Sequence, residues 1–264
     1  MVRTLPILFA LVVSMMAQEP ERVTVPFSDP TGAKRLAVSL LHGSIAVKGH
    51  SGREVIIEAK GSGASQGRLP PEGMRRIGGG GAGLTVEESG NLVKVNTSHG
   101  RRADLTVLVP IETSVKLNTV TGGNISVDGV NGEIDVNNLN GNISISNVSG
   151  AVVAHSLNGR VTVSLNKVSP EKAMSFSTLN GNVDVTLPAD IKANVKMKSE
   201  NGDIFSDFEI ALNPSSARPT QEPGGDRKRY RIRFDKAVYG SINGGGPEIQ
   251  FTTLNGTIYI RKQK

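Results

Sequence analysis

Residues 121–165 read TGGNISVDG, VNGEIDVNN, LNGNISISN, VSGAVVAHS and LNGRVTVSL, five consecutive segments of nine residues. Glycine occupies the third position of every segment, usually after Asn, and Ile or Val occupies the fifth and seventh positions with a single Ala as exception. Repetition at a short fixed period is typical of architectures in which each unit packs only on its neighbours. This stretch therefore decides the expected fold class.

Each segment predicts one short strand and one turn. Ile or Val alternating with Ser, Asp or Thr is the pattern of a strand with one buried face. Asn-Gly favours a turn, because glycine adopts backbone conformations that other residues avoid. Asparagines stacked at successive turns can also form side-chain amide ladders. Related units recur outside the core repeat, and the predicted structural turns are Asn131, Gly132, Asn140, Gly141, Asn158, Gly159, Asn180, Gly181, Asn201, Gly202, Asn255 and Gly256.

Two all-β arrangements can use such a unit. In an antiparallel meander, each Asn-Gly forms a hairpin, and the first position lies on the same face as the polar fourth position. A leucine at the first position would then lie on the polar face. In a stack of coils, each corner reorients the chain, so the first, fifth and seventh positions can all turn inward. The pattern favours a β-solenoid or β-roll-like stack of short strands built from nine-residue and longer repeats. A bulge or a longer turn keeps the hairpins as an alternative.

The N-terminal segment is typical of an export signal. Arg3 precedes an apolar run from Leu5 to Ala17, and polar residues follow. We predict a signal peptide over residues 1–17, cleaved near Ala17. An uncleaved membrane anchor is the alternative, although the run is shorter than the roughly 20 residues that a span needs. Residues 18–264 are expected to form a single β-repeat domain without a transmembrane segment, with long Gly- and Pro-rich loops at 61–83 and 213–229.

Composition limits the possible partners. The chain has no cysteine, so an exported protein of this kind fits a bacterium better than a disulfide-rich secretory pathway. The formal net charge is +6, with basic clusters at 227–233 and 261–264. Single-stranded nucleic acid is bound by basic grooves with stacking aromatics, whereas this chain has three tyrosines and no tryptophan. We therefore exclude nucleic acid and expect at most attraction to anionic envelope polymers.

Motifs for catalysis or metal binding are absent from the sequence. There is no cysteine nucleophile and no G-x-S-x-G elbow, and the four histidines are isolated along the chain. The G-G-x-G-x-D pattern of calcium-binding β-rolls is missing as well. Asp135 and Asp184 are the acids that a polysaccharide-cleaving β-helix could bring together. We predict no catalytic, cofactor-binding or metal-ligating residues, and no cofactor.

Three stretches together carry a family resemblance. They are DLTVLVP, SVKLNTVTGGNISVDGVNGEIDV and the ending GGGPEIQFTTLNGTIYIRK, which occur in this order within residues 100–264. The sequence resembles a bacterial β-strand-repeat family of candidate adhesins, formerly a domain of unknown function. The resemblance implies a stack of short strands and a role in surface contact, and it brings no catalytic residues.

These observations together predict an exported, non-catalytic module for adhesion, binding or structure at the cell envelope. The expected location is extracytoplasmic: the periplasm, the cell surface or the medium. Envelope polysaccharide or a surface protein is the expected class of partner. A carbohydrate-active enzyme on a β-helix and a periplasmic partner in envelope stress or signalling stay open as alternatives.

Overall fold

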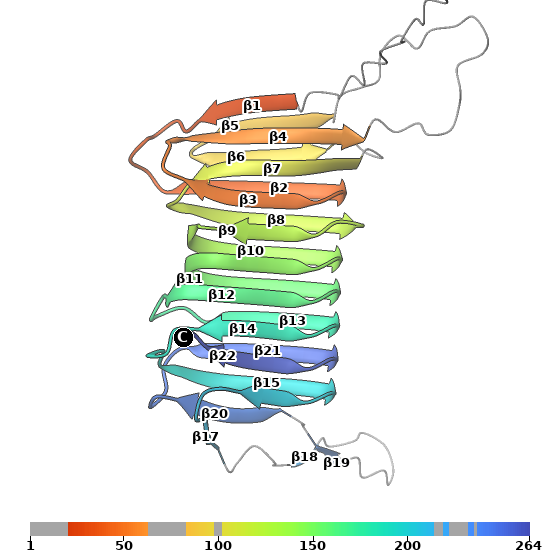
Figure 1. The fold of residues 1–264 in the computed structure, drawn as a ribbon, viewed down its shortest axis with the longest axis vertical. Helices are drawn as coiled ribbons and strands as arrows, with labels where there is room; N and C mark the ends of the chain where they lie inside the picture. The colour runs from red at the N-terminus through yellow and green to blue at the C-terminus, as the bar shows by residue number, and fades with distance from the viewer. Residues whose placement is uncertain (1–20, 63–82, 98–101, 214–218, 222–231, 235–236) are drawn as a thin grey trace, which may run out of the picture.

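The computed structural model describes residues 21–62, 83–97, 102–213, 219–221, 232–234 and 237–264. Every regular element in these ranges is a β-strand, which confirms the all-β prediction (Figure 1). No helix among the described residues is long and apolar enough to cross a membrane. The predicted signal peptide, residues 63–82 of the first loop and basic residues 227–231 lie outside the described ranges.

Two predicted loop boundaries need correction. Strand β4 (Glu54–Ser62) continues into the start of the loop expected at 61–83, because its last residues still pair with β7 (Arg102–Pro110). Within the loop expected at 213–229, β18 (Pro219–Gln221) pairs with β19 (Ile232–Phe234). These two short strands form a separate two-stranded sheet.

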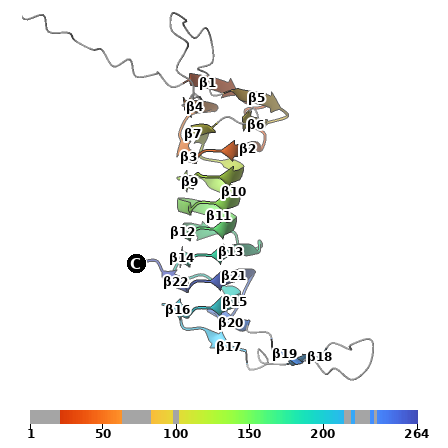
Figure 2. The ribbon, with the colours of Figure 1, turned by 90° about the vertical axis from the view of Figure 1, so that its right-hand side faces the viewer.

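The main body consists of two rows of strands that face each other across the core, seen edge-on in Figure 2. Strand β11 passes from one row into the other, so that hydrogen bonding joins both into one 20-stranded sheet. We call the rows the first and the second sheet. The first sheet has the order β5 (Leu84–Ser89), β6 (Leu92–Thr97), β2 (Lys34–His42), β8 (Thr113–Thr121), β10 (Asn131–Asn140), the C-terminal half of β11 (Ile143–Asn158), β13 (Met174–Asn180), β21 (Glu248–Asn255), β15 (Ala193–Asn201), β20 (Val238–Ile242) and β17 (Ala211–Leu212). The second sheet has the order β1 (Glu21–Pro26), β4, β7, β3 (Ile45–His50), β9 (Ile125–Asp128), the N-terminal half of β11, β12 (Val161–Val168), β14 (Val183–Leu187), β22 (Ile258–Lys262) and β16 (Ile204–Ser206).

A nine-residue segment is half of one coil. Ile125 pairs in parallel with Ile143, and Ile143 pairs with Val161, at steps of eighteen residues. Successive segments therefore alternate between the two sheets, and the structural period is twice the sequence period. Because the neighbouring coils pair in parallel, the antiparallel meander does not form in the repeat. The result is an all-β, solenoid-like repeat.

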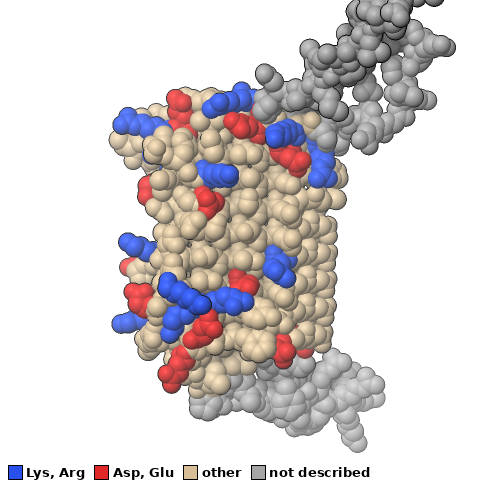
Figure 3. All heavy atoms as spheres, in the orientation of Figure 1, with Lys and Arg blue, Asp and Glu red and all other residues tan. Residues whose placement is uncertain are grey.

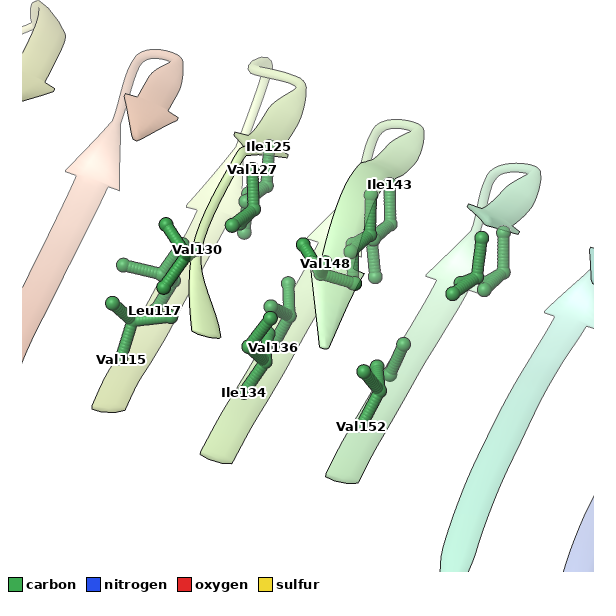
Figure 4. Packing of buried hydrophobic residues seen from close by; sticks show 14 of the residues in the cluster. Val115, Leu117, Ile125, Val127, Val130, Ile134, Val136, Ile143, Val148 and Val152 are labelled. Atoms are coloured by element: carbon green, nitrogen blue, oxygen red, sulfur yellow. The ribbon is translucent and has the colours of Figure 1, made fainter. Parts of the chain in front are cut away.

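Aliphatic side chains at the fifth and seventh positions of both sheets fill the core (Figure 4). The first position behaves in two ways. Val130 and Val148 are buried, whereas Leu139 and Leu157 are 41% and 39% exposed. The expectation that the first position can turn inward with the fifth and seventh holds for these valines and is wrong for the leucines.

The stacking order departs from the chain order at both ends. The coil of β2 and β3 lies between the coil of β6 and β7 and that of β8 and β9. The coil of β21 and β22 lies between the coil of β13 and β14 and that of β15 and β16. The ends of the stack carry antiparallel strands. Strands β1 and β5 are edge strands at one end, and at the other end β20 pairs antiparallel with both β15 and β17.

Candidate functional site

Most of the predicted turn residues lie at one corner of the coil, where the first sheet leads into the second. We call it the Leu-Asn-Gly corner. Its asparagines form a continuous side-chain ladder in which Nδ2 of one amide donates to Oδ1 of the next at 2.7–2.9 Å. Along the stack the ladder joins Asn140, Asn158, Asn180, Asn255 and Asn201. Asn131 and Gly132 lie at the opposite corner, where the Asn131 amide donates to Glu112 at 3.1 Å.

The glycines of the Leu-Asn-Gly corner are required by close stacking of the backbone. A Cβ atom on Gly159 would lie 2.1 Å from the carbonyl oxygen of Gly141. A Cβ atom on Gly181 would lie 2.2 Å from the carbonyl oxygen of Gly159, and Gly181 also has a φ of +153°. Each glycine therefore lets the next coil approach to hydrogen-bonding distance.

At this corner, every exposed apolar residue except Leu41, which follows the buried Leu40, is preceded by a buried polar side chain that bonds to the glycine of the neighbouring coil. The Ser156 hydroxyl donates to the carbonyl of Gly141 at 3.1 Å, and the Asn138 amide donates to that of Gly123 at 2.9 Å. Because this polar residue takes the inward direction, the residue after it points outward. That is the physical reason why the leucines are exposed.

The exposed apolar side chains form a row that we call the leucine ridge. Its members share one column of the first sheet and are 38–41% exposed. They are Leu41, Val120, Leu139, Leu157, Leu179 and Leu254. In the next coil the column continues with Glu200, whose carboxylate pairs with Lys198 at 2.9 Å.

The next row of outward side chains on the first sheet is polar, and from β2 to β21 it contains no acidic or basic side chain other than His155. A shallow hollow of about 420 Å³ lies here, lined by ridge residues and by Asn118, Asn137 and His155. His155 bonds through Nδ1 to the hydroxyl of Ser177. Figure 3 views the other face of the molecule, the outer face of the second sheet, and along its right-hand margin, where the first-sheet strands of Figure 1 end, no charged side chain is visible over the middle coils.

A second candidate surface lies on the outer face of the second sheet, and we call it the second-sheet strip. It begins at a polar hollow of about 440 Å³. The side chains that line this hollow include Asn142, Ser144, Arg160, Thr162 and Asn182. Thr162 pairs with Asp184 on the next strand, and the same column continues through Tyr259 to Phe205.

The lower end of the strip is aromatic and charged. The rings of Phe205 and Tyr259 are stacked, with centroids 5.7 Å apart and an interplanar angle of 18°, and Phe205 is 54% exposed. The Arg261 guanidinium lies 5.1 Å from the Tyr259 ring centroid and donates to both carboxylate oxygens of Asp184, at 2.7 and 3.2 Å. The hydrogen bonds to Asp184 and its negative charge raise the pKa of Arg261.

The two acids considered for polysaccharide cleavage do not meet. Asp135 lies on the outer face of the first sheet and pairs with Lys116 at 2.9 Å, whereas Asp184 lies on the outer face of the second sheet. Among the described residues, no three His, Asp or Glu side chains are close enough together to hold a metal ion. The arrangement offers hydrogen bonds, an ion pair and stacking surfaces, which are suited to binding.

Sequence reasoning missed both surfaces. The ridge had a signal: the first position of the repeat alternates between Val and Leu, so that Leu139 and Leu157 recur every eighteen residues. The aromatic end of the strip had none, because Phe205 and Tyr259 are far apart in the chain and meet only through the pairing of β16 with β22.

Comparisons with known proteins identify the family of the chain. The model of the Toastrack DUF4097 family matches residues 22–237, which confirms the family resemblance seen in the sequence. A solved structure of a candidate cell adhesion protein from Clostridium sporogenes is 13% identical, with a TM-score of 0.49, and the alignment covers 93% of this chain and 100% of that one. A candidate adhesin from Bacteroides fragilis is 10% identical, with a TM-score of 0.42 and coverages of 94% and 98%. No curated protein matches the chain.

Proposed function

The chain belongs to the Toastrack DUF4097 family, and from this premise we propose that it is a non-catalytic binding module of the bacterial cell envelope. Its ligand in this proposal is envelope polysaccharide, held on the second-sheet strip. Export rests on the signal peptide predicted at residues 1–17, and it places the module outside the cytoplasm.

The chemistry of the strip matches that of a sugar chain. A pyranose ring offers an apolar C–H face and a rim of hydroxyl groups. The exposed ring of Phe205 presents an apolar surface to the C–H face of the sugar. Asn142, Ser144 and Thr162 supply amide and hydroxyl groups that can bond to the sugar hydroxyls. Because strands repeat at about 4.8 Å, the strip is a flat track along which successive sugar units can lie.

One observation carries the proposal: an exposed aromatic stack lies in the same column as a bidentate Asp–Arg pair and beside a polar hollow. A single exposed aromatic ring is ordinary on a protein surface. A ring that adjoins fixed donors and acceptors provides both the stacking and the orientation that a polyhydroxylated ligand needs.

The enzyme alternative gains no support from the described residues. A glycosidase of the common type places two carboxyl groups about 5–10 Å apart around the scissile bond. Asp184 is held by Arg261, and Asp135 projects from the opposite sheet. We therefore favour binding without cleavage.

The test measures binding of purified protein to polysaccharide extracted from the native host's envelope, by calorimetry and by co-sedimentation. We expect saturable binding and at least a tenfold loss of affinity in the Phe205→Ala, Tyr259→Ala double variant. Leu212→Ala, at another exposed apolar side chain, is the matched control and should bind like the wild type.

Circular dichroism and the unfolding temperature establish that the variants are folded. Absence of wild-type binding, or equal binding by the double variant, would refute the proposal. Release of new reducing ends from the polysaccharide would instead establish an enzyme. Fractionation of host cells tests the location, and a purely cytoplasmic protein would contradict export.

A further inference from the structure

The leucine ridge has no part in the proposed polysaccharide contact. It lies at the Leu-Asn-Gly corner and projects from the first sheet, whereas the strip lies on the second. Six apolar side chains in an unbroken column therefore face solvent without a role.

The size of the ridge distinguishes it from scattered exposed leucines. Its six members lie on adjacent strands, so at about 4.8 Å per strand the column is roughly 24 Å long. With each side chain about 40% exposed, the ridge presents on the order of 400 Å² of apolar surface, within the range at which surface patches are often functional.

The spacing of the ridge indicates what covers it. Its side chains repeat at the strand spacing, and a partner whose apolar side chains repeat at the same interval can contact all of them together. A second copy of this chain has that interval by construction. We infer that two copies associate through their leucine ridges, antiparallel about a two-fold axis between Leu139 and Leu157.

The charges agree with self-association at this surface. The chain carries a formal charge of +6, so two copies repel each other over most approaches. The ridge and the polar row beside it contain no Asp, Glu, Lys or Arg from the coil of β2 to that of β21. Glu200 in the following coil places a charge where the apolar column stops and limits how far the two ridges can slide.

The area sets the expected strength. The ridge alone provides about half of the roughly 800 Å² per partner of a standard interface, and the asparagines and small polar side chains on either side bring it toward the lower limit. The dimer is therefore reversible and depends on protein concentration.

Sedimentation velocity over a concentration series tests the inference with the protein lacking the predicted signal peptide, residues 18–264. The wild-type sedimentation coefficient should rise from the monomer to the dimer value as concentration increases. Leu157→Asp should keep the protein monomeric throughout, because the dimer would bury the carboxylate without a partner. Ile111→Asp is matched, since Leu157 and Ile111 are both 39% exposed and Ile111 lies away from the ridge, and it should dimerise like the wild type.

A second measurement uses the absence of cysteine from the chain. A short bismaleimide should cross-link Leu157→Cys into dimers, whereas Ile111→Cys should stay largely monomeric. A wild type that is monomeric at every concentration, or ridge variants that dimerise like the wild type, would overturn the inference. Neither result depends on polysaccharide, so the two proposals fail separately.

Discussion

The two corners of the coil use the same nine-residue motif with opposite results. At the Leu-Asn-Gly corner, the first-position leucine points outward, and asparagine and glycine columns repeat from coil to coil. At the opposite corner, Val130 and Val148 point into the core directly after Gly129 and Asn147, which have φ values of 69° and 54°. The left-handed residue turns the following side chain inward. The repeated local pattern therefore fixes the bend, and the residue before it fixes the direction in which the first-position side chain points.

The two corners also differ in how much the length of the connecting segment varies from coil to coil. The chain runs through the Leu-Asn-Gly corner with the same short connection in successive coils of the repeat. At the opposite corner, longer connections follow β12 and β14, and a hollow of about 630 Å³ is lined by Val168, Pro170, Pro188, Ile191 and Pro247. At the Leu-Asn-Gly corner, the side-chain ladders require a fixed connection length. At the opposite corner, only one valine per coil is buried, so longer connections can be inserted there.

The largest expected contrast concerns the two glycine positions. Gly159→Ala places a methyl group 2.1 Å from a carbonyl oxygen, whereas Gly132→Ala at the other corner places it 2.8 Å from one. We expect Gly159→Ala to cost about 3–5 kcal/mol of unfolding free energy, because the coils must separate, and Gly132→Ala to cost clearly less. Urea unfolding followed by circular dichroism measures both. An equal loss of unfolding free energy in the two variants would show that close backbone stacking is not specific to the Leu-Asn-Gly corner.

The first position of the repeat provides the next contrast. Val148→Ala removes two buried methyl groups and should cost about 2 kcal/mol. Leu157→Ala truncates a side chain on the ridge, and monomeric protein should change by no more than about 0.5 kcal/mol. Denaturant midpoints at low protein concentration distinguish the two. A large loss in Leu157→Ala would mean that the ridge stabilises the single chain.

Replacing asparagine should also cost more stability at the Leu-Asn-Gly corner than at the opposite corner. Asn158→Ala removes the bonds that Asn158 shares with Asn140 and Asn180, and we expect a cost of about 1 kcal/mol. Asn131→Ala removes one exposed bond to Glu112, for about 0.5 kcal/mol or less. Thermal unfolding under identical conditions compares them. If both variants lost equally little, the ladder would be a consequence of stacking rather than a cause of stability.

The smallest expected effect is a pH dependence at the opposite corner. Hydrogen bonds from Ser146 and Asn147 hold the pKa of Asp128 below its usual value. A carboxyl group with a lowered folded-state pKa stabilises the fold above its unfolded-state pKa, and this stabilisation is lost as the pH falls through the folded-state pKa. Asp128→Asn should therefore show a smaller drop in unfolding temperature between pH 6 and pH 2. An unchanged profile would assign the acid sensitivity to other groups, such as Glu88, whose pKa is lowered by Ser28.

The repeat predicts the strands and the core from the sequence because both depend on local alternation. Ile134 and Val136 point into the core because side chains alternate between the two faces of a strand, and the sequence shows this alternation as a period of two. The direction of Leu139 was not predictable from its own segment, since it depends on Asn138 bonding to a glycine fifteen residues away. The aromatic stack depends on the pairing of β16 with β22, and no local pattern encodes that pairing.

The order of the coils has a consequence for how the molecule is made. Strand β13 pairs with β21, and Asn180 bonds to Asn255, which is synthesised 75 residues later. Until the last strands are synthesised, β13 and β14 lack the partners on one side that they have in the final structure. The coil of β21 and β22 must then insert between the coil of β13 and β14 and that of β15 and β16. Completion of the body is therefore a late, long-range event, and such contacts slow folding.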